Sequence, residues 1–314
     1  MNQLETLKNF NHQEFTQHLL NPLSELFGSS TKIGEIAPFG KIKGVMDETK
    51  KLMVKDSMGH KIAVVLCSSQ VAPKLLAREA KQSNLAKQLL EPELGNHILT
   101  PSYQGEFEGL TYIIMRYCLP LSDRRLIWYF QRAFLSPTLF KWLAQITSAT
   151  VTELNSSQIE QEFVIPLQHL IELDPMTDRV RSGARLALAR LESGEWQPSH
   201  VLMHGDLWKG NILLDLENKS QLGFFKIIDW GGSLIEGYAM YDLIRLGLSL
   251  KLRPMQMHQQ IGSHCQILGC DLVDARSHLV SALAYRAMNL EYFPMDRFVT
   301  TADHCFAALE KAGA

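Results

Sequence analysis

Two short apolar segments with polar residues at their ends constrain this sequence most strongly. The first reads HGDLWKGNILL over residues 204–214, and the second reads IIDWGG over residues 227–232. Carboxylate and amide groups beside strand-like apolar runs are costly to enclose unless they are hydrogen-bonded, paired or bound to a metal. We therefore expect Asp206, Asn211 and Asp229 to lie at the ends of buried strands and to have a chemical role.

The length and charge of the chain narrow the classes of protein it can be. Its 314 residues are enough for two lobes, and 46% hydrophobic with 20% charged residues is a globular composition. The formal net charge is -2 and the sequence pI is about 6.6. Because no basic field is present, we expect no nucleic-acid partner.

The N-terminus and the cysteines indicate a cytoplasmic protein. The first residues, MNQLETLKNFNHQEF, lack the basic and apolar regions of a signal peptide. No apolar run approaches the roughly 18 residues that a membrane span needs, so we expect no membrane partner. The 5 cysteines contain no CxxC pair and are expected to be reduced thiols. The oligomeric state is not determined by these features.

The part before residue 120 is predicted to be rich in strands. A first helix is indicated by the apolar spacing of Phe15, Leu19, Leu20, Leu23 and Leu26. The stretch KLMVKDSMGHKIAVVLCSS predicts a hairpin, and GLTYIIMRYCLP predicts a further strand that ends at Pro120. Between them a helix is expected over residues 71–90, with an apolar stripe formed by Leu75, Leu76, Ala80, Leu85 and Leu89.

The part from residue 120 onward is predicted to be mostly helical. Helices are expected near 123–135, 138–154, 160–173, 176–193, 239–250, 254–268, 272–289 and 298–311. A break between the first two is placed at Ser136-Pro137. Short strands are expected at 200–203, 211–215 and 223–228. A strand-rich first part and a helix-rich second part predict an α+β fold.

The polar residues of the two segments fit the chemistry of phosphoryl transfer. That reaction needs a metal held against phosphates and a group that orients and deprotonates the attacking hydroxyl. Magnesium prefers oxygen ligands, which Asp229 and the amide oxygen of Asn211 can provide. Asp206, five positions before Asn211, is free to face the acceptor hydroxyl. The alternative is a purely structural hairpin in which these residues cap turns.

The two segments resemble the catalytic motifs of the protein-kinase superfamily. HGDLWKGN matches the pattern H-R-D-L-x-x-x-N except at its second position, and DWG stands in place of D-F-G. With Gly205 at that position, the loop is similar to aminoglycoside phosphotransferase-like enzymes, a branch that includes choline, homoserine and fructosamine kinases. The resemblance implies a two-lobe, kinase-like α+β fold. A small β-rich N-lobe, residues 1–119, would bind nucleotide, and a larger α-helical C-lobe, residues 120–314, would carry the catalytic loop and substrate site.

The same resemblance implies roles for individual residues. Asp206 would be the catalytic base, and Asn211 and Asp229 would hold Mg²⁺ against ATP. His204 would brace the loop by hydrogen bonds, and Asp242, in MYDLIRL, would be structural as well. The implied cofactors are therefore ATP and Mg²⁺.

Further positions in the first part match the family's nucleotide site. Glu79 stands where a helix of the family carries the Glu that braces the ATP-binding lysine. The main chain near Arg116 and Cys118 stands where the hinge meets adenine. Taken alone, Glu79 is also compatible with a solvated surface position, and the YIIMRYC segment with an ordinary core strand.

One departure from the family pattern concerns the lysine of the third strand. The family motif V-A-x-K ends in a lysine that reaches the α- and β-phosphates, but here Val65 or Leu66 occupies that position. Polyphosphate enclosed in a site still requires positive charge. Lys41 and Lys43, in FGKIKG, fall where the phosphate-covering loop would lie, and one of them is predicted to substitute. The alternative is that both are solvated loop lysines.

The sequence thus favours an ATP- and Mg²⁺-dependent kinase that acts on a hydroxyl group of a small molecule. Trp208 makes the loop similar to fructosamine kinases, which indicates a sugar or glycated amine as acceptor. The balance of acidic and basic residues after Asp229 argues against a polycationic aminoglycoside. Because the strand lysine is missing, a pseudokinase-like module that binds a nucleotide or partner without turnover remains the alternative.

Overall fold

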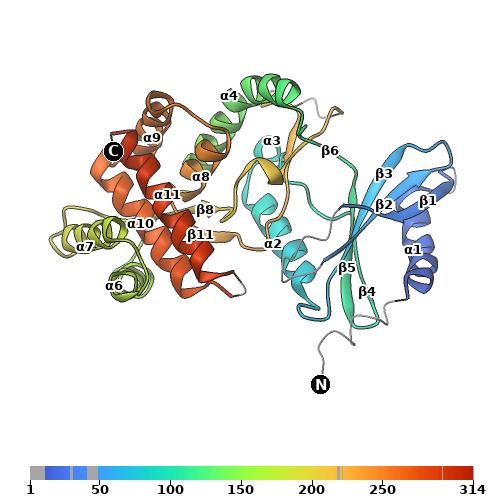
Figure 1. Ribbon diagram of the computed structural model, residues 1–314, viewed down its shortest axis with the longest axis horizontal. Helices are drawn as coiled ribbons and strands as arrows, with labels where there is room; N and C mark the ends of the chain where they lie inside the picture. The colour runs from blue at the N-terminus through green and yellow to red at the C-terminus, as the bar shows by residue number, and fades with distance from the viewer. Residues whose placement is uncertain are drawn as a thin grey trace. The chain divides into compact units, whose positions relative to one another are not determined.

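The computed structural model describes residues 11–28, 31–40, 49–217, 220, 222–291 and 293–313. The chain divides into two compact units (Figure 1). We call Met1–Lys81 with Leu99–Tyr117 the first unit, and Gln82–Ile98 with Cys118–Ala314 the second unit. The crossing after Tyr117 lies close to the boundary expected at residue 119, but residues 82–98 belong to the second unit. The reason is that Ala86, Leu90 and Leu94 are buried in the core of that unit.

An antiparallel sheet with the strand order β1-β2-β3-β5-β4 forms the first unit (Figure 1). Its strands are β1 (Ile33–Pro38), β2 (Lys50–Asp56), β3 (Lys61–Cys67), β4 (Tyr103–Phe107) and β5 (Leu110–Arg116). The predicted hairpin is confirmed as β2 and β3, in which Leu52 pairs with Val65. The strand predicted before Pro120 is β5.

Helix α1 (His12–Phe27) covers one face of this sheet. Phe15, Leu19 and Leu23 are buried in a core shared with Val65 of β3, so the first predicted helix is confirmed. Leu20, which was expected to join the apolar stripe, is exposed because the stripe follows every fourth position from Phe15.

Helix α2 (Leu75–Leu89) buries only part of the predicted stripe, namely Leu76 and Ala80. Leu85 and Leu89 are exposed, whereas the buried positions are Leu76, Glu79, Ala80, Ser83, Ala86 and Leu90. The buried set is spaced by three or four residues, as one helix face requires, but it includes small and polar residues. An apolar count alone therefore identified Leu76 and Ala80 correctly, but it missed the small and polar residues that complete the buried face.

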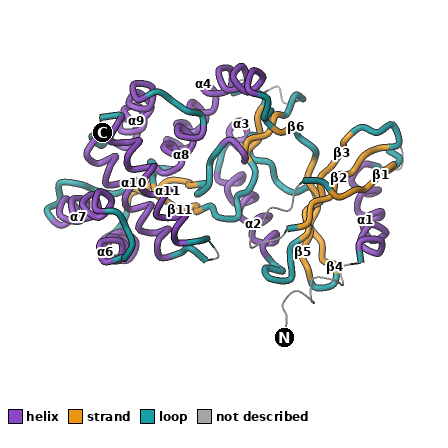
Figure 2. The backbone as a smooth tube through the Cα atoms, in the orientation of Figure 1, coloured by secondary structure: helices purple, strands orange, loops and turns teal. Residues whose placement is uncertain are grey.

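The second unit is mainly helical (Figure 2). Its longer helices are α4 (Arg125–Thr150), α6 (Ile165–Glu172), α7 (Asp178–Glu192), α8 (Tyr241–Ser249), α9 (Pro254–Leu268), α10 (Leu272–Met288) and α11 (Met295–Lys311). Shorter helical segments are α3 (Pro92–Gly95), α5 (Ser156–Ile159), a π-helix (Glu160–Val164) and a 3₁₀ turn (Lys209–Asn211). Helix α10 packs against α6, α7, α9 and α11 and forms the centre of this unit.

Two small antiparallel sheets lie beside these helices. One has the order β10-β9-β6 and the other β11-β8-β7. Their strands are β6 (Leu119–Pro120), β7 (Thr152–Glu153), β8 (Ser199–Met203), β9 (Ile212–Leu214), β10 (Phe225–Ile227) and β11 (Leu234–Tyr238). The three short strands expected here are confirmed as β8, β9 and β10. Strand β11 was not predicted, because its pairing with β8 is a tertiary contact.

Helix α4 corrects the prediction of two helices separated at Ser136-Pro137. It runs unbroken past Pro137, which lacks the N–H that would reach the carbonyl one turn earlier. The hydroxyl groups of Ser136 and Thr138 donate to the carbonyls of Arg132 (2.7 Å) and Leu135 (2.9 Å), respectively. Burial of the residues that follow stabilises the helix beyond the proline; these are Leu139, Phe140, Trp142 and Leu143.

The strand-rich first unit and helical second unit confirm the predicted α+β class. All five cysteines have free thiols. None of the helices in the described ranges has the length and apolar composition that crossing a membrane requires.

Candidate active site

The loop that follows β8 is held by a buried carboxylate of α8. Asp242 accepts hydrogen bonds from the backbone N–H groups of His204 (2.6 Å) and Gly205 (3.0 Å). It is 6% exposed and lies in the first turn of its helix, where a negative charge is favourable. Burial raises the pKa of Asp242, and His204, Gly205 and Arg286 oppose that shift. The contacts support the structural role expected for this residue.

His204 joins the two segments that the sequence singled out. Its Nδ1 accepts a hydrogen bond from the Asp206 N–H (3.2 Å), and its Nε2 lies 2.9 Å from the carbonyl oxygen of Ile228. These two bonds together assign the ring proton to Nε2. The ring also packs against Trp230, with centroids 4.6 Å apart. His204 therefore braces the loop and lies beside the segment that carries Asp229.

The backbone geometry explains the glycine at position 205. Gly205 has a φ of 84°, and a Cβ there would lie 2.7 Å from the carbonyl oxygen of Gly232. A side chain would thus be strained by φ and would collide with the second segment. The Gly205 carbonyl accepts a hydrogen bond of 2.6 Å from Arg286 of α10. The arginine of the kinase pattern does not fit this loop, because the DWGG segment approaches it closely.

The carboxylate of Asp206 is oriented from two sides and remains accessible. Nη2 of Arg245 donates to its Oδ1 at 3.0 Å, and the Asn211 amide nitrogen lies 3.4 Å from its Oδ2. The same amide donates to the Asp206 carbonyl at 2.9 Å. The Asp206 side chain is 45% exposed. It is therefore a fixed carboxylate that a small molecule in solution can reach.

Arg245 was not identified as a site residue from the sequence. Burial opposes its charge, but Tyr241 and Asp206 raise the pKa of the guanidinium, so it stays cationic. A local feature of the sequence could have identified it, because Arg245 follows Asp242 by three positions and so lies on the same face of α8. Arg286, which binds the Gly205 carbonyl, gave no such signal because it comes from α10.

Asn211 and Asp229 are brought together by the main chain. The N–H of Ile228, directly before Asp229, donates to the Asn211 carbonyl at 3.0 Å. Because the Asn211 amide nitrogen is used by Asp206, its Oδ1 is the atom left for a metal. No group in the described ranges donates a hydrogen bond to that Oδ1.

The backbone at Asp229 has an unusual conformation. Its φ is 68°, in the left-handed region that aspartate tolerates better than most residues, and its side chain is exposed. The next residue, Trp230, is buried and its indole N–H donates to the Ile227 carbonyl at 3.2 Å. Strained backbone of this kind concentrates at functional sites.

The donor set fits magnesium that also binds phosphate. No cluster of three or more His, Cys, Asp or Glu side chains that can hold a metal occurs in the described part of the chain. The Asn211 amide oxygen and the Asp229 carboxylate are two hard oxygen donors. Mg²⁺ commonly uses one or two carboxylates, with substrate phosphates and water completing the octahedron.

The remaining predicted residues belong to other elements of the fold, and their roles stay predictions. Glu79 is 6% exposed on α2, and Arg116 ends β5; both belong to the first unit. Cys118 is buried in the second unit. Lys41 and Lys43 lie outside the described residues.

Strand β3 has no lysine on either face of its central part. Val65 is fully buried in the core beneath α1, so it cannot be the position that faces a nucleotide. Alternate residues Ile62, Val64 and Leu66 lie on the other face and are partly buried. Leu66 pairs directly with Lys51 of β2, and directly opposed side chains share a face about 5 Å apart. Lys51 is exposed. It is the lysine that the strand register places beside Leu66.

Comparisons with known proteins show the fold. A family model described as "Uncharacterized oxidoreductase dhs-27" matches residues 197–253, which include residues 204–214 and 227–232, the two segments that the sequence singled out. No curated protein sequence matches the chain.

Similar solved structures cover nearly the whole chain at low identity. One is the GDP complex of wild-type aminoglycoside 2'-phosphotransferase-IIIa, with a TM-score of 0.55 at 16% identity over 94% of this chain and 98% of that chain. Another is a putative fructosamine-3-kinase from Haemophilus somnus 129PT, with a TM-score of 0.51 at 13% identity over 92% and 96%. The chain therefore has the kinase-like fold of small-molecule phosphotransferases, which confirms the predicted fold.

Proposed function

We propose that this protein is an ATP- and Mg²⁺-dependent phosphotransferase that acts on a hydroxyl group of a small molecule. The observation that carries the proposal is the junction of the two segments. There the segments that carry the half-exposed Asp206 carboxylate, the Asn211 amide oxygen and the Asp229 carboxylate are joined by two hydrogen bonds, from the Asn211 side-chain amide to the Asp206 carbonyl and from the Ile228 N–H to the Asn211 carbonyl. The solved structures that share the fold include a phosphotransferase with bound GDP.

The residues divide the reaction between them. Asp206 receives the hydroxyl proton of the acceptor as the oxygen attacks the γ-phosphorus and the bond to ADP breaks. Arg245 is bound to Oδ1, so the proton goes to Oδ2. Asn211 and Asp229 would hold Mg²⁺, which neutralises charge on the transferring phosphoryl group. Arg245 acts as a positioning residue, because it touches the base and fixes its direction.

Lys51 of β2 would supply a second cation for the phosphates, in addition to Mg²⁺. Lys51 stands beside Leu66, the apolar residue at the position of the expected strand lysine. Its side chain can carry an ammonium group over that position, since directly opposed residues lie about 5 Å apart. Lys41 and Lys43 remain the competing candidates.

The acceptor site includes the exposed face of Trp208. This side chain is 39% exposed and lies two positions after Asp206. Its ring packs on Gly210, where a Cβ would come within 2.4 Å of it. An exposed aromatic face on the same loop as Asp206 suits a sugar ring or a glycated amine, which is the acceptor class we propose.

A panel of acceptors tests the proposal. Sugars, amino alcohols and glycated amines are each added to the protein with MgATP, and ADP release is measured. We expect at least one class to raise ADP release above the rate with water alone. A pseudokinase-like module is the second candidate, favoured by the apolar residues Ile62, Val64 and Leu66 on β3. It predicts that MgATP binds but that no acceptor raises ADP release.

A further inference from the structure

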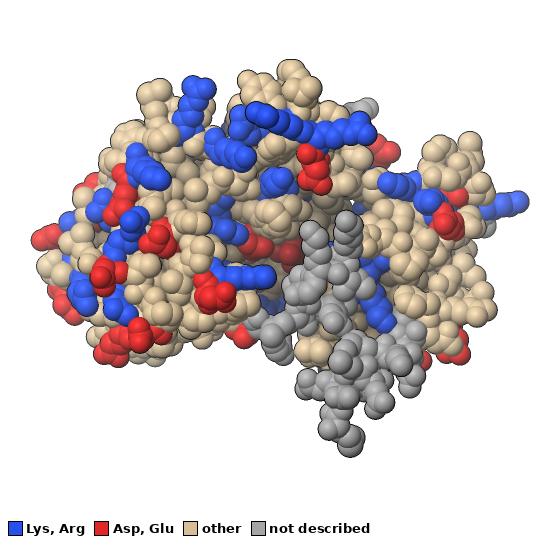
Figure 3. All heavy atoms as spheres, in the orientation of Figure 1, with Lys and Arg blue, Asp and Glu red and all other residues tan. Residues whose placement is uncertain are grey.

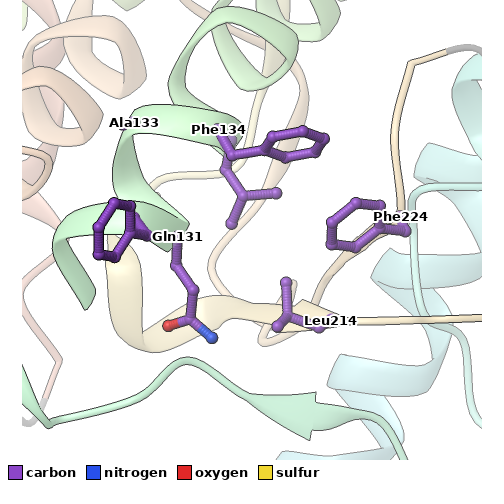
Figure 4. Close-up of a pocket in the computed structure, with 7 residues that line it drawn as sticks. Gln131, Ala133, Phe134, Leu214 and Phe224 are labelled. Carbon is purple, nitrogen blue, oxygen red and sulfur yellow. The ribbon is translucent and has the colours of Figure 1, made fainter. Parts of the chain in front are cut away.

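An apolar groove and a pair of thiols lie outside the candidate active site in the second unit. The groove has a volume of about 560 Å³, and Figure 4 shows Phe134, Leu214 and Phe224 around it. Its lining residues carry no titratable or nucleophilic side chain. The thiols belong to Cys265 and Cys270, at the end of α9. Because thiols can be oxidised and reduced, this pair has a chemistry of its own.

The end of α9 folds back on itself through a left-handed glycine. Gly269 has a φ of 65° and a ψ of 30°, and its N–H donates to the Cys265 carbonyl. The N–H of Cys270 donates to the same carbonyl at 3.0 Å. This second bond defines a Schellman motif, in which the side chains of the two bonded residues commonly touch. The backbone geometry therefore places Cys265 and Cys270 side by side.

Hydrogen bonds connect the two thiols to each other and to the chain that follows. Sγ of Cys265 donates to the carbonyl oxygen of Asp271 at 3.2 Å. A hydrogen bond between the two thiols lowers the pKa of Cys265 and raises the pKa of Cys270. Burial and the carboxylates of Asp271 and Asp274 oppose the lowered pKa of Cys265. The pair therefore shares one proton when it ionises.

The two thiols differ in their access to solvent. Cys265 is buried in the core of the second unit, whereas Cys270 is only partly buried and follows the exposed Gly269. Arg190 of α7 lies 3.9 Å from the carboxylate of Asp271, next to Cys270. On the face drawn in Figure 3, acidic and basic side chains are interspersed over α7, so no extended field of one sign there repels a charged reagent. A small reagent in solution reaches Cys270 first.

The three other thiols are protected. Cys67, Cys118 and Cys305 are buried. Burial raises the pKa of Cys67 and of Cys305 to about 11. Because the thiolate is the reactive form, buried thiols of this kind react slowly. Oxidation should therefore be confined to the pair at the end of α9.

We propose that Cys265 and Cys270 form a reversible disulfide when the protein meets a low-molecular-weight disulfide such as oxidised glutathione. Disulfides of this transient kind occur in proteins whose other thiols stay reduced. The free thiols of the structure are the reduced state of the pair. The site is independent of the proposed phosphotransfer, since it uses neither Asp206, Asn211 nor Asp229.

The reaction proceeds by two exchanges. Transfer of the shared proton to Cys265 leaves a thiolate on Cys270, which attacks one sulfur of the oxidant and breaks its sulfur–sulfur bond. The products are a mixed disulfide on Cys270 and one reduced glutathione. The Cys265 sulfur, as thiolate, then attacks the Cys270 sulfur and releases a second glutathione. Two protein thiols are oxidised, one disulfide is reduced, and both thiol protons end on glutathione.

Mass spectrometry locates the bond. The folded full chain is equilibrated with reduced and oxidised glutathione, its free thiols are blocked, and it is digested with trypsin. Residues 252–276 form one tryptic peptide that contains Cys265 and Cys270 and no other cysteine. We expect this peptide to lack two hydrogen atoms and both blocking groups, and dithiothreitol to restore the reduced form.

The contribution of the fold is measured by comparing folded and urea-unfolded chains in the same buffers. Because the helix end holds the thiols in contact, we expect the folded chain to be half oxidised at a value of [GSH]²/[GSSG] that is at least about tenfold higher. A matched pair of variants tests the turn. Gly269→Val should lower this value about fivefold, because valine is strained in the left-handed region. Gly269→Asn should behave like wild type, because asparagine tolerates that region.

Single cysteine variants test the order of the two exchanges. Cys265→Ser should retain one glutathione on Cys270, because the sulfur that displaces it is missing. Cys270→Ser should leave Cys265 largely unmodified, because that thiol is buried. The control Cys67→Ser changes a buried thiol of the first unit and should form the disulfide like wild type. Circular dichroism checks that each variant is folded.

Several results would overturn the proposal. Glutathione that accumulates on wild-type Cys270 without closure of the disulfide is one. Equal oxidation of the folded and unfolded chains, or of Gly269→Val and Gly269→Asn, would show that the helix end does not bring the thiols together. A covalent dimer through Cys270 would assign that thiol to contact between copies. Oxidation of Cys67, Cys118 or Cys305 before the pair would remove its selectivity.

Discussion

The loop that carries Asp206 in the second unit and strand β3 of the first unit differ in how closely their residues match the proposed phosphotransfer chemistry. In the loop, Asp242 holds the N–H groups of His204 and Gly205, and Arg245 holds the Asp206 carboxylate. In β3, the residues that alternate with the buried core face are apolar, and the lysine of the family pattern is missing.

This difference indicates which of the required chemical groups can be supplied from a different element of the fold. A base and metal ligands must occupy fixed positions relative to one another, so several hydrogen bonds fix their loop. A cation that neutralises phosphate charge needs only to be near, and a lysine on a long flexible stem can come from a neighbouring strand. We therefore expect large losses of turnover from changes in the loop and modest losses of ATP affinity from changes around β3.

The largest effect is expected at the base. Asp206→Asn should lower turnover by roughly 10²–10⁴-fold, because an amide keeps the shape but cannot accept the acceptor proton. Its affinity for MgATP should stay close to that of the wild type. The control Asp296→Asn changes an exposed carboxylate on α11 and should turn over normally. Unchanged turnover in Asp206→Asn would remove Asp206 from the mechanism.

The next effect concerns stability at acidic pH. We expect the stability of the second unit to depend on pH more strongly than that of the first unit. His278 is fully buried and accepts a hydrogen bond from the Trp196 indole N–H at 3.4 Å. Burial lowers its pKa from 6.5 to about 4. The pKa of His278 is lower in the folded protein than in the unfolded chain. The contribution of neutral His278 to the free energy of unfolding is therefore complete above pH 6.5 and is lost as the pH falls toward 4. The expected loss is roughly 3 kcal/mol.

Urea unfolding as a function of pH measures this loss. His278→Gln should flatten the pH dependence, whereas His169→Gln, at an exposed position of α6, should not change it. Burial also lowers the pKa of His200 and His264 in the second unit. The described histidines of the first unit are all exposed: His12, His18 and His60. If the wild-type stability were the same throughout this pH range, the buried neutral histidine would be contradicted.

A smaller loss is expected at the metal ligands. Asp229→Ala should lower the magnesium-dependent gain in ATP affinity by about tenfold or more, because an ionic ligand is lost. Asn211→Ala should weaken it less, since an amide oxygen is neutral. Calorimetry of ATP binding with and without Mg²⁺ provides both values. The same magnesium effect in wild type and Asp229→Ala would refute the assignment.

The smallest effect is expected at β2. Lys51→Ala should weaken ATP binding about tenfold, the usual worth of one charged hydrogen bond, and should leave adenosine binding unchanged. Lys32→Ala is the matched control at an exposed position of the first unit. A loss in Lys41→Ala/Lys43→Ala together with an unaffected Lys51→Ala would transfer the role to that segment. If the wild type bound no ATP at all, the proposed function itself would fail.

The sequence predicted the loop better than its surroundings, for physical reasons. Asp206, Asn211 and Asp229 match a motif with fixed spacings, so the sequence could single them out, and hydrogen bonds join their two segments in the structure. Arg286 reaches the loop from α10, and no spacing records that contact. The buried face of α2 was predicted only at Leu76 and Ala80, because burial of Glu79 and Ser83 there depends on packing and not on hydrophobicity.

The path of α4 shows a similar limit. Pro137 is a strong local signal for a break, yet the helix continues because its second half is buried in the core. Tertiary packing outweighed a local cost of about 3 kcal/mol.

A single-turnover experiment with ATP labelled in its γ-phosphate distinguishes phosphotransfer from nucleotide binding without turnover. The protein is held in excess over MgATP and mixed with the acceptor that gives the strongest ADP release. We predict that the wild type transfers the label to the hydroxyl of the acceptor. With Asp206→Asn the label should remain in ATP. Label that stays in bound ATP with the wild type and every acceptor would contradict phosphotransfer and identify a nucleotide-binding module without turnover.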